Sequence, residues 1–208
     1  MQLPRLYVIL DAALLAAREV SVRDFATQMR DAGVDMLQYR NKTDGPAVLL
    51  RDAEIISQVF AESAAMLVMN DRADLAVLAE WDGVHLGQQD LSPGDVRRVV
   101  GAGRSIGIST HNDEQVRAAE LGCADYIAIG PVFATSSKAN PDPIVGLEGV
   151  RRARELTQKP LVAIGGITLA NAADVIAAGA DSVAVISALL PAGESPEKVA
   201  RDFLALLR

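Results

Sequence analysis

The sequence has little of several features that define other classes of protein. It contains one cysteine, which excludes an internal disulfide, and no apolar stretch reaches the roughly 20 residues that span a bilayer. Asp and Glu outnumber Lys and Arg by 27 to 20, which argues against nucleic acid and anionic membranes as partners, since both require a basic face. The first residues lack a signal-peptide pattern, and we therefore expect a cytoplasmic protein.

The single cysteine is expected to be structural. Cys123 follows Gly122 in a turn and precedes an apolar run that is typical of a strand. In that position a small buried side chain is favoured over a nucleophile.

Short apolar runs alternate with amphipathic segments along the whole chain. The expected strands cover residues 6–10, 36–39, 65–69, 83–86, 105–108, 126–129, 160–164 and 182–186. The clearest helical patterns cover residues 22–31, 46–62, 112–121, 147–156 and 169–178. Strands and helices that alternate with short loops favour a closed (β/α)8 TIM barrel, an α/β fold that 208 residues can complete as a single catalytic domain, 1–208.

A weak repeat indicates which aspartates are structural. Asp35, Asp125 and Asp181 each follow a glycine that closes a helical segment and precede a strand. They therefore belong to the face of the barrel opposite the active site, where they would stabilise the fold.

Six of the expected strands end in polar or glycine-rich residues. These are residues 38–42, 70–71, 87–90, 109, 130–138 and 165–166. Because a parallel sheet collects the ends of all its strands on one face, these segments predict a single site.

Gln38, Arg40 and Lys42 alternate along an extended segment, so their side chains point the same way. Two cations and an amide can hold a diphosphate and a polar ring. The alternative is a patch of surface ion pairs.

Asp71 and Asp90 each follow a strand. Two converging carboxylates suit Mg²⁺, which takes one or two carboxylates together with phosphate oxygens of a substrate. Alternatively, Arg72 or Asp74 could pair with Asp71.

Two further segments favour phosphate binding. The ends of the last two strands, at Gly165-Gly166 and Ile186-Ser187, lie where barrels often hold a phosphate. The polar run from Thr135 through Ser136 and Ser137 to Lys138 is typical of a ligand loop with hydroxyl donors and an ammonium group.

The motifs together resemble the thiamine phosphate synthase family over nearly the whole chain. The matching segments are Leu6 to Ile9, Gln38 to Lys42, Asn70 to Arg72, Gly83 to Gln88, Gly107 to His111, Gly130 to Phe133, Lys138, Ala163 to Ile167 and Val183 to Ser187. Ser137 stands where the family pattern has threonine and keeps the hydroxyl. Asn41 stands where it has an acidic residue and is expected to point away from Gln38, Arg40 and Lys42.

The resemblance implies a transferase that joins hydroxymethylpyrimidine diphosphate to a thiazole phosphate and releases diphosphate. It implies that the pyrimidine diphosphate is bound by Gln38, Tyr39, Arg40, Asn41, Lys42, Asn70, Ser109 and Lys138. It assigns the thiazole phosphate to Thr135, Ser136, Ser137, Gly166, Ile186 and Ser187, and Mg²⁺ to Asp71 and Asp90. Arg40 and Lys138 would act as catalytic residues by stabilising the departing diphosphate.

Two other functions fit the same fold. A thiazole tautomerase would use His111 as its acid or base, but it has no use for the full set of Arg40, Lys42, Asp71, Asp90 and Lys138. A non-catalytic sensor would bind one phosphorylated ligand without Mg²⁺. The sequence leaves the oligomeric state open.

Overall fold

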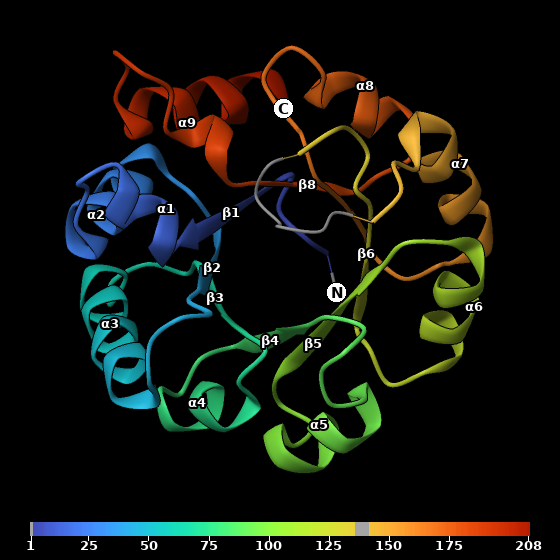
Figure 1. The fold of residues 1–208 in the computed structure, drawn as a ribbon, viewed down its shortest axis with the longest axis horizontal. Coiled ribbons are helices and arrows are strands. Elements are labelled where there is room, and N and C mark those ends of the chain that lie inside the picture. The colour runs from blue at the N-terminus through green and yellow to red at the C-terminus, as the bar shows by residue number, and fades with distance from the viewer. Residues whose placement is uncertain (1, 136–141) are drawn as a thin grey trace.

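The protein is described by a computed structural model that covers residues 2–135 and 142–208. Its parallel strands form a closed barrel in which each strand pairs with the next and β8 pairs with β1 (Figure 1). The strands are β1 (Leu6–Asp11), β2 (Met36–Arg40), β3 (Met66–Asn70), β4 (Gly83–Leu86), β5 (Ser105–Thr110), β6 (Tyr126–Ile129), β7 (Leu161–Ile164) and β8 (Ser182–Val185).

Helices surround the barrel on the outside (Figure 1). They are α1 (Ala12–Ala17), α2 (Val22–Ala32), α3 (Pro46–Val59), α4 (Ala73–Leu78), α5 (Pro93–Val100), α6 (Asp113–Leu121), α7 (Gly146–Leu156), α8 (Ala172–Ala177), α9 (Pro196–Leu206) and the short 3₁₀ helix η1 (Ser187–Leu189). The predicted TIM barrel is confirmed, and each expected strand overlaps an observed one. Helix α8 begins later than predicted because the Asn171 side chain accepts a bond from the Thr168 amide (2.8 Å) and closes a turn first.

The ends of α2 illustrate how local sequence sets the elements. The Ser21 hydroxyl caps the first turn by accepting a bond from the Asp24 amide (3.0 Å). Gly33 ends the helix with φ +86°, a left-handed conformation that glycine adopts at no steric cost. The chain then enters β2 directly.

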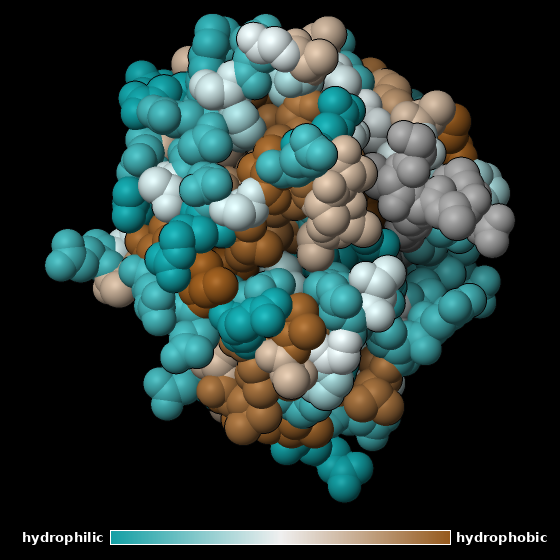
Figure 2. All heavy atoms as spheres, turned by 60° about the vertical axis from the view of Figure 1, so that its left-hand side comes forward, coloured by the Kyte–Doolittle hydropathy of each residue, from teal (hydrophilic) through white to brown (hydrophobic). Residues whose placement is uncertain are grey.

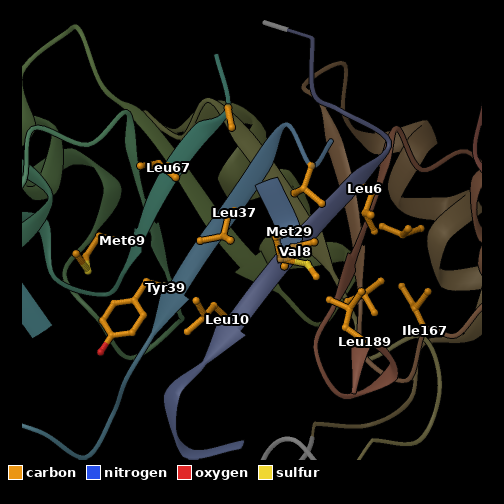
Figure 3. Packing of buried hydrophobic residues seen from close by; sticks show 14 of the residues in the cluster. Leu6, Val8, Leu10, Met29, Leu37, Tyr39, Leu67, Met69, Ile167 and Leu189 are labelled. Atoms are coloured by element: carbon orange, nitrogen blue, oxygen red, sulfur yellow. The ribbon is translucent and has the colours of Figure 1, made fainter. Parts of the chain in front are cut away.

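Buried apolar residues form two layers. The larger one lies between the strands and the helices and includes Leu37 and Met69, which Figure 3 shows on β2 and β3. The smaller one fills the barrel interior and includes Tyr7, Tyr126 and Val162. Successive side chains of a strand alternate between these two layers, so one strand supplies both.

Aspartates close the face at the N-terminal ends of the strands. The side chains of Asp82, Asp125 and Asp181 each accept a bond from the first part of a neighbouring strand, at the amides of Leu67 (2.8 Å), Ile106 (2.7 Å) and Leu161 (2.8 Å). Asp125 and Asp181 also bind Arg97 and Arg154. The predicted structural role of these two aspartates is therefore confirmed, and the backbone at Asp35 pairs with Met66 in the same layer (2.9 Å).

The surface is mainly hydrophilic on the face that Figure 2 shows, with apolar residues in separate groups between polar ones. The expectation that Cys123 is buried is wrong: its side chain is exposed, because the chain enters β6 by burying Ala124 instead. Among the residues that the structure describes, no helix is both long enough and apolar enough to cross a membrane.

Candidate active site

A pocket opens at the C-terminal end of the barrel, where side chains from most of the strands meet. Its lining consists of Ile9, Gln38, Arg40, Lys42, Asn70, Asp71, His85, Gly87, Ser109, Pro131, Thr135, Ile164, Gly165 and Ile186. Segments that are distant in the sequence thus converge, as parallel strand ends predict.

One wall of the pocket is cationic. Gln38, Arg40 and Lys42 all line it, which confirms that their side chains point the same way. Arg40 is oriented by an ion pair with Asp11, its partner in the register between β1 and β2. Asp11 also caps α1 by accepting a bond from the Leu14 amide (2.9 Å), so its carboxylate is fixed at two points.

The side chains of Tyr39 and Asn41 lie on the other side of β2. Tyr39 is fully buried and donates its hydroxyl to Asp52 on α3 (2.7 Å). Asn41 donates to the Tyr39 hydroxyl (3.0 Å) and accepts from the Asp44 amide (3.1 Å), which stabilises the turn that follows. The structure therefore brings neither side chain to the pocket, although the family pattern includes both positions.

Two carboxylates approach each other beside the cationic wall. Burial raises the pKa of Asp71, the nearby Asp90 raises it further, and Lys42, whose Nζ lies 3.0 Å from Asp71 Oδ2, opposes the shift. Asp90 also accepts a bond from the Gly87 amide (2.8 Å). Arg72 pairs with Asp74 rather than with Asp71, so the alternative ion pair does not form.

The backbone at Asp71 is unusual. Its φ is +61°, in the left-handed region that aspartate tolerates better than most residues, and its amide donates to the His85 carbonyl (2.8 Å). This bond holds the end of β3 against β4 and directs the carboxylate into the pocket.

The donor set at this place fits Mg²⁺. Burial and the neighbouring Asp90 raise the pKa of Asp71, and a dication between the two carboxylates would relieve this crowding; Mg²⁺ usually completes its shell with water and phosphate oxygens. Among the described residues no group of three or more His, Cys, Asp or Glu forms a cation site, so an ion here would depend on the substrate for further ligands.

The floor of the pocket carries polar side chains from the barrel interior. Gln38, Asn70, His85 and Ser109 are all buried and face it. The Nδ2 atom of Asn70 has no hydrogen-bond partner in the described structure. A buried donor without a partner is costly, and a ligand acceptor at this place would satisfy it.

A second hollow adjoins the first at the ends of β7 and β8. Its lining includes Thr135, Gly166, Ile186 and Ser187, all predicted for a phosphate. Gly166 has φ +69°, and an added Cβ would lie 2.5 Å from the Ala134 carbonyl oxygen, so the backbone itself forms this wall. Helix η1 begins at Ser187, which also lines the hollow.

Three of the predicted residues lie outside the described part of the chain. These are Ser136, Ser137 and Lys138, which follow Thr135 directly. Thr135 itself lines both hollows.

Some residues of the site were not predicted. Ile9 and Asp11 come from β1 and His85 comes from β4, and none of them was predicted from the sequence to be a site residue. The acidic residue at the end of β1 was a usable signal for Asp11, since every other strand with a polar end contributes to the pocket.

His111 does not line either hollow of the site. Its Nδ1 lies 2.5 Å from the Gly130 carbonyl oxygen and its Nε2 lies 3.3 Å from Asp142. The ring is thus held between the end of β6 and the segment that leads into α7.

Comparison with known proteins finds relatives over nearly the whole chain. The chain is 48% identical to the thiamine-phosphate synthase of Koribacter versatilis, over 100% of this chain and 97% of that protein. It is 45% identical to the thiamine-phosphate synthase of Methanoculleus marisnigri, over 91% and 89% of the two chains. The solved structure of thiamine phosphate pyrophosphorylase from Pyrococcus furiosus superposes with a TM-score of 0.86 at 30% identity and covers 98% of this chain and 95% of its own.

A family defined by the description "Thiamine monophosphate synthase" matches residues 6–189. This match extends from the first strand into η1 and includes every residue of the pocket. The chain therefore belongs to the thiamine monophosphate synthase family.

Proposed function

We propose that this enzyme of thiamine biosynthesis joins hydroxymethylpyrimidine diphosphate to a thiazole phosphate by a dissociative, Mg²⁺-assisted substitution. Its membership of the family and its relatives support the transferase activity. The observation that carries the proposal is the presence of two adjoining hollows that share Thr135 and Gly165 in their lining, each with groups suited to an anion. Arg40 and Lys42 line one hollow, and Gly166 and Ser187 line the other.

The cationic end suits the diphosphate. Arg40 is directed by Asp11, so its guanidinium is pre-oriented for two phosphate oxygens. Lys42 is free to exchange its partner Asp71 for a phosphate when that carboxylate turns to a cation. Mg²⁺ held by Asp71 and Asp90 would neutralise charge on the leaving diphosphate.

The remaining groups bind and orient the two rings. Gln38, Asn70 and Ser109 lie on the floor and can hydrogen-bond a pyrimidine, whereas Ile9, Ile164 and Ile186 offer an apolar wall between the two ends. In the proposed mechanism diphosphate leaves first and the thiazole nitrogen captures a pyrimidine cation. A cavity that aligns both rings supplies much of the rate enhancement for such a step.

No protein nucleophile is needed for this chemistry, because the bond to diphosphate breaks without one. The tautomerase alternative requires an acid or base at the thiazole, and the position of His111 outside both hollows does not support it. Lys138 remains our predicted second catalytic cation, and it lies outside the described residues. We also expect the protein to work in the cytoplasm on small phosphorylated substrates.

The direct test supplies the purified protein with both phosphorylated precursors and Mg²⁺. We expect thiamine phosphate and diphosphate in equal amounts, and loss of the reaction when the cation is chelated. Calorimetric binding of one phosphorylated ligand without turnover would instead identify a sensor. Proton exchange on the thiazole substrate without coupling would identify a tautomerase.

A further inference from the structure

A chain of hydrogen bonds crosses the barrel interior directly below the pocket. Gln38 Nε2 donates to the Tyr7 hydroxyl (2.7 Å), and the Tyr7 and Tyr126 hydroxyls lie 3.0 Å apart. The Tyr126 hydroxyl lies 3.0 Å from His85 Nδ1, and His85 Nε2 lies 2.9 Å from Ser109 Oγ. The chain therefore connects five strands, and both of its ends, Gln38 and Ser109, face the pocket.

All members of the chain are shielded from water. Tyr7 and Tyr126 are 1% and 0% exposed, and Gln38, His85 and Ser109 are also buried. Burial raises the pKa of both tyrosines well above its ordinary value, so both hydroxyls keep their protons. Each tyrosine can then donate one hydrogen bond only.

This limit gives the chain a direction. Because Tyr7 accepts from Gln38, its own proton goes to the Tyr126 oxygen, and the Tyr126 proton goes to His85 Nδ1. His85 must then carry its proton on Nε2 and donate it to Ser109.

The direction also decides what the two ends offer to a ligand. Gln38 has used one N–H on Tyr7, which leaves its Oε1 as the acceptor on the pocket side. Ser109 accepts from His85 and so keeps its hydroxyl proton for donation. With the chain reversed, Gln38 would turn its amide, and both ends would exchange donor for acceptor.

The interior is shaped around this chain. At Gly107 on β5, an added Cβ would lie 2.0 Å from Cζ of Tyr126, so only glycine admits the ring there. The Tyr7 and Tyr126 rings meet edge to face at 6.2 Å, and the His85 ring lies 5.6 Å from Tyr126. The rings therefore have little freedom to rearrange.

We propose that Tyr7, Tyr126 and His85 are positioning residues whose one-way hydrogen-bond chain selects an aminopyrimidine over an oxopyrimidine in the pocket. The choice of ring class rests on the proposed function. An amino group donates to Gln38 Oε1, whereas a ring carbonyl would place two acceptors against each other. Sites built on such pairing reject the wrong partner strongly, because their buried polar groups are left unpaired.

The first experiment measures the direction of the chain in the native protein. The protein has 2 histidines, so ¹⁵N-histidine labelling gives a simple NMR spectrum. The variant His111→Gln identifies which signals belong to His85. We expect His85 to be neutral, with a proton on Nε2 and none on Nδ1. Tyr126→Phe should remove the donor to Nδ1 and shift that signal.

The control for this spectrum is Tyr39→Phe. Tyr39 is an equally buried tyrosine, but its hydroxyl bonds Asp52 outside the barrel interior, so the His85 signals should not move. A native His85 that carries its proton on Nδ1, or on both nitrogens, would overturn the proposal.

The second experiment measures specificity. We compare kcat/KM for the pyrimidine diphosphate and for its analogue with a carbonyl in place of the amino group. Tyr7→Phe frees the Gln38 amide to turn, and we expect the preference for the amino compound to fall about tenfold, the worth of one hydrogen bond. An unchanged preference in a variant that folds like the native protein would count against the proposal.

The two experiments separate this inference from the proposed function. If the protein forms no thiamine phosphate, the proposed function fails, and the histidine spectrum still decides whether the chain exists. If coupling proceeds and His85 is protonated on Nδ1, only the inference fails.

Discussion

Aspartates at the two faces of the barrel have different roles. At the N-terminal face, Asp82, Asp125 and Asp181 are satisfied by strand amides at 2.7 to 2.8 Å. At the C-terminal face, Asp71 and Asp90 crowd each other, and Asn70 Nδ2 is unpartnered in the described structure. The N-terminal face is satisfied within the protein, whereas the C-terminal face keeps, among the described residues, a crowded carboxylate and an unpartnered donor that suit a bound ligand.

The comparison predicts that changes at the C-terminal face affect catalysis most. Asp71→Asn and Asp90→Asn should each lower kcat/KM about 100-fold or more, since each removes a carboxylate that we propose as a ligand of the Mg²⁺ ion that offsets charge on the leaving group. Steady-state rates measured across Mg²⁺ concentrations, together with thermal unfolding, check this. Variants that retain near-native Mg²⁺-dependent rates would show that the cation lies elsewhere.

Substitutions at the N-terminal face should lower the stability of the fold rather than the activity. Asp125→Ala leaves the Ile106 amide and Arg97 without their shared acceptor, and we expect a loss of about 1–3 kcal/mol in the free energy of unfolding. Denaturant unfolding measures the loss. The activity of the folded fraction should stay native, and a large fall in kcat would break the division between the faces.

Substitution of Asp11 should have a smaller effect on the kinetics, and one that is specific to binding of the pyrimidine diphosphate. Asp11→Asn keeps an oxygen to cap α1 but removes the charge that directs Arg40. We expect KM for the pyrimidine diphosphate to rise about tenfold, with a lesser change in kcat. The exposed carboxylate variant Asp24→Asn is the control, and an equal rise in KM there would assign the effect to net charge instead.

The smallest expected effect is an opposite pH dependence of stability at the two faces. Burial raises the pKa of Asp71 above its ordinary value of 3.8. Between these two pKa values the folded state holds a proton that the unfolded chain has released, so the contribution of Asp71 to stability falls as pH rises above 3.8. Thr157 lowers the pKa of Glu120 by hydrogen bonding, so Glu120 adds stability above its ordinary value of 4.5 and loses it as pH falls.

The free energy of unfolding, measured without Mg²⁺ from acid to neutral pH, tests these two contributions. Asp71→Asn should reduce the part of this free energy that falls with rising pH, and Glu120→Gln should reduce the part that increases with rising pH. Glu120 is partly exposed, and solvent screening will keep its effect small. Slopes of the same sign in both variants would contradict the assignment.

Much of this arrangement was predictable because it depends on strand periodicity. Alternation along β2 placed Gln38, Arg40 and Lys42 on one side, and the order of strands brought Asp71 and Asp90 together.

The sequence could not predict side-chain contacts between different strands, because these depend on how the barrel closes. Tyr7 and Tyr126 read as ordinary core residues of apolar strands, and only the closed structure shows their hydroxyls in contact. Likewise, Asp11 becomes a partner of Arg40 through the register between β1 and β2, which a single strand pattern does not specify.

The fit of Tyr126 against Gly107 has an evolutionary consequence. A larger residue at position 107 is compatible with this interior only after the ring at 126 has been lost, so the two substitutions have an obligatory order. The positions should therefore vary together among relatives, as residues in contact do. An alignment in which tyrosine at 126 coexists freely with larger residues at 107 would show that the ring has another place to lie.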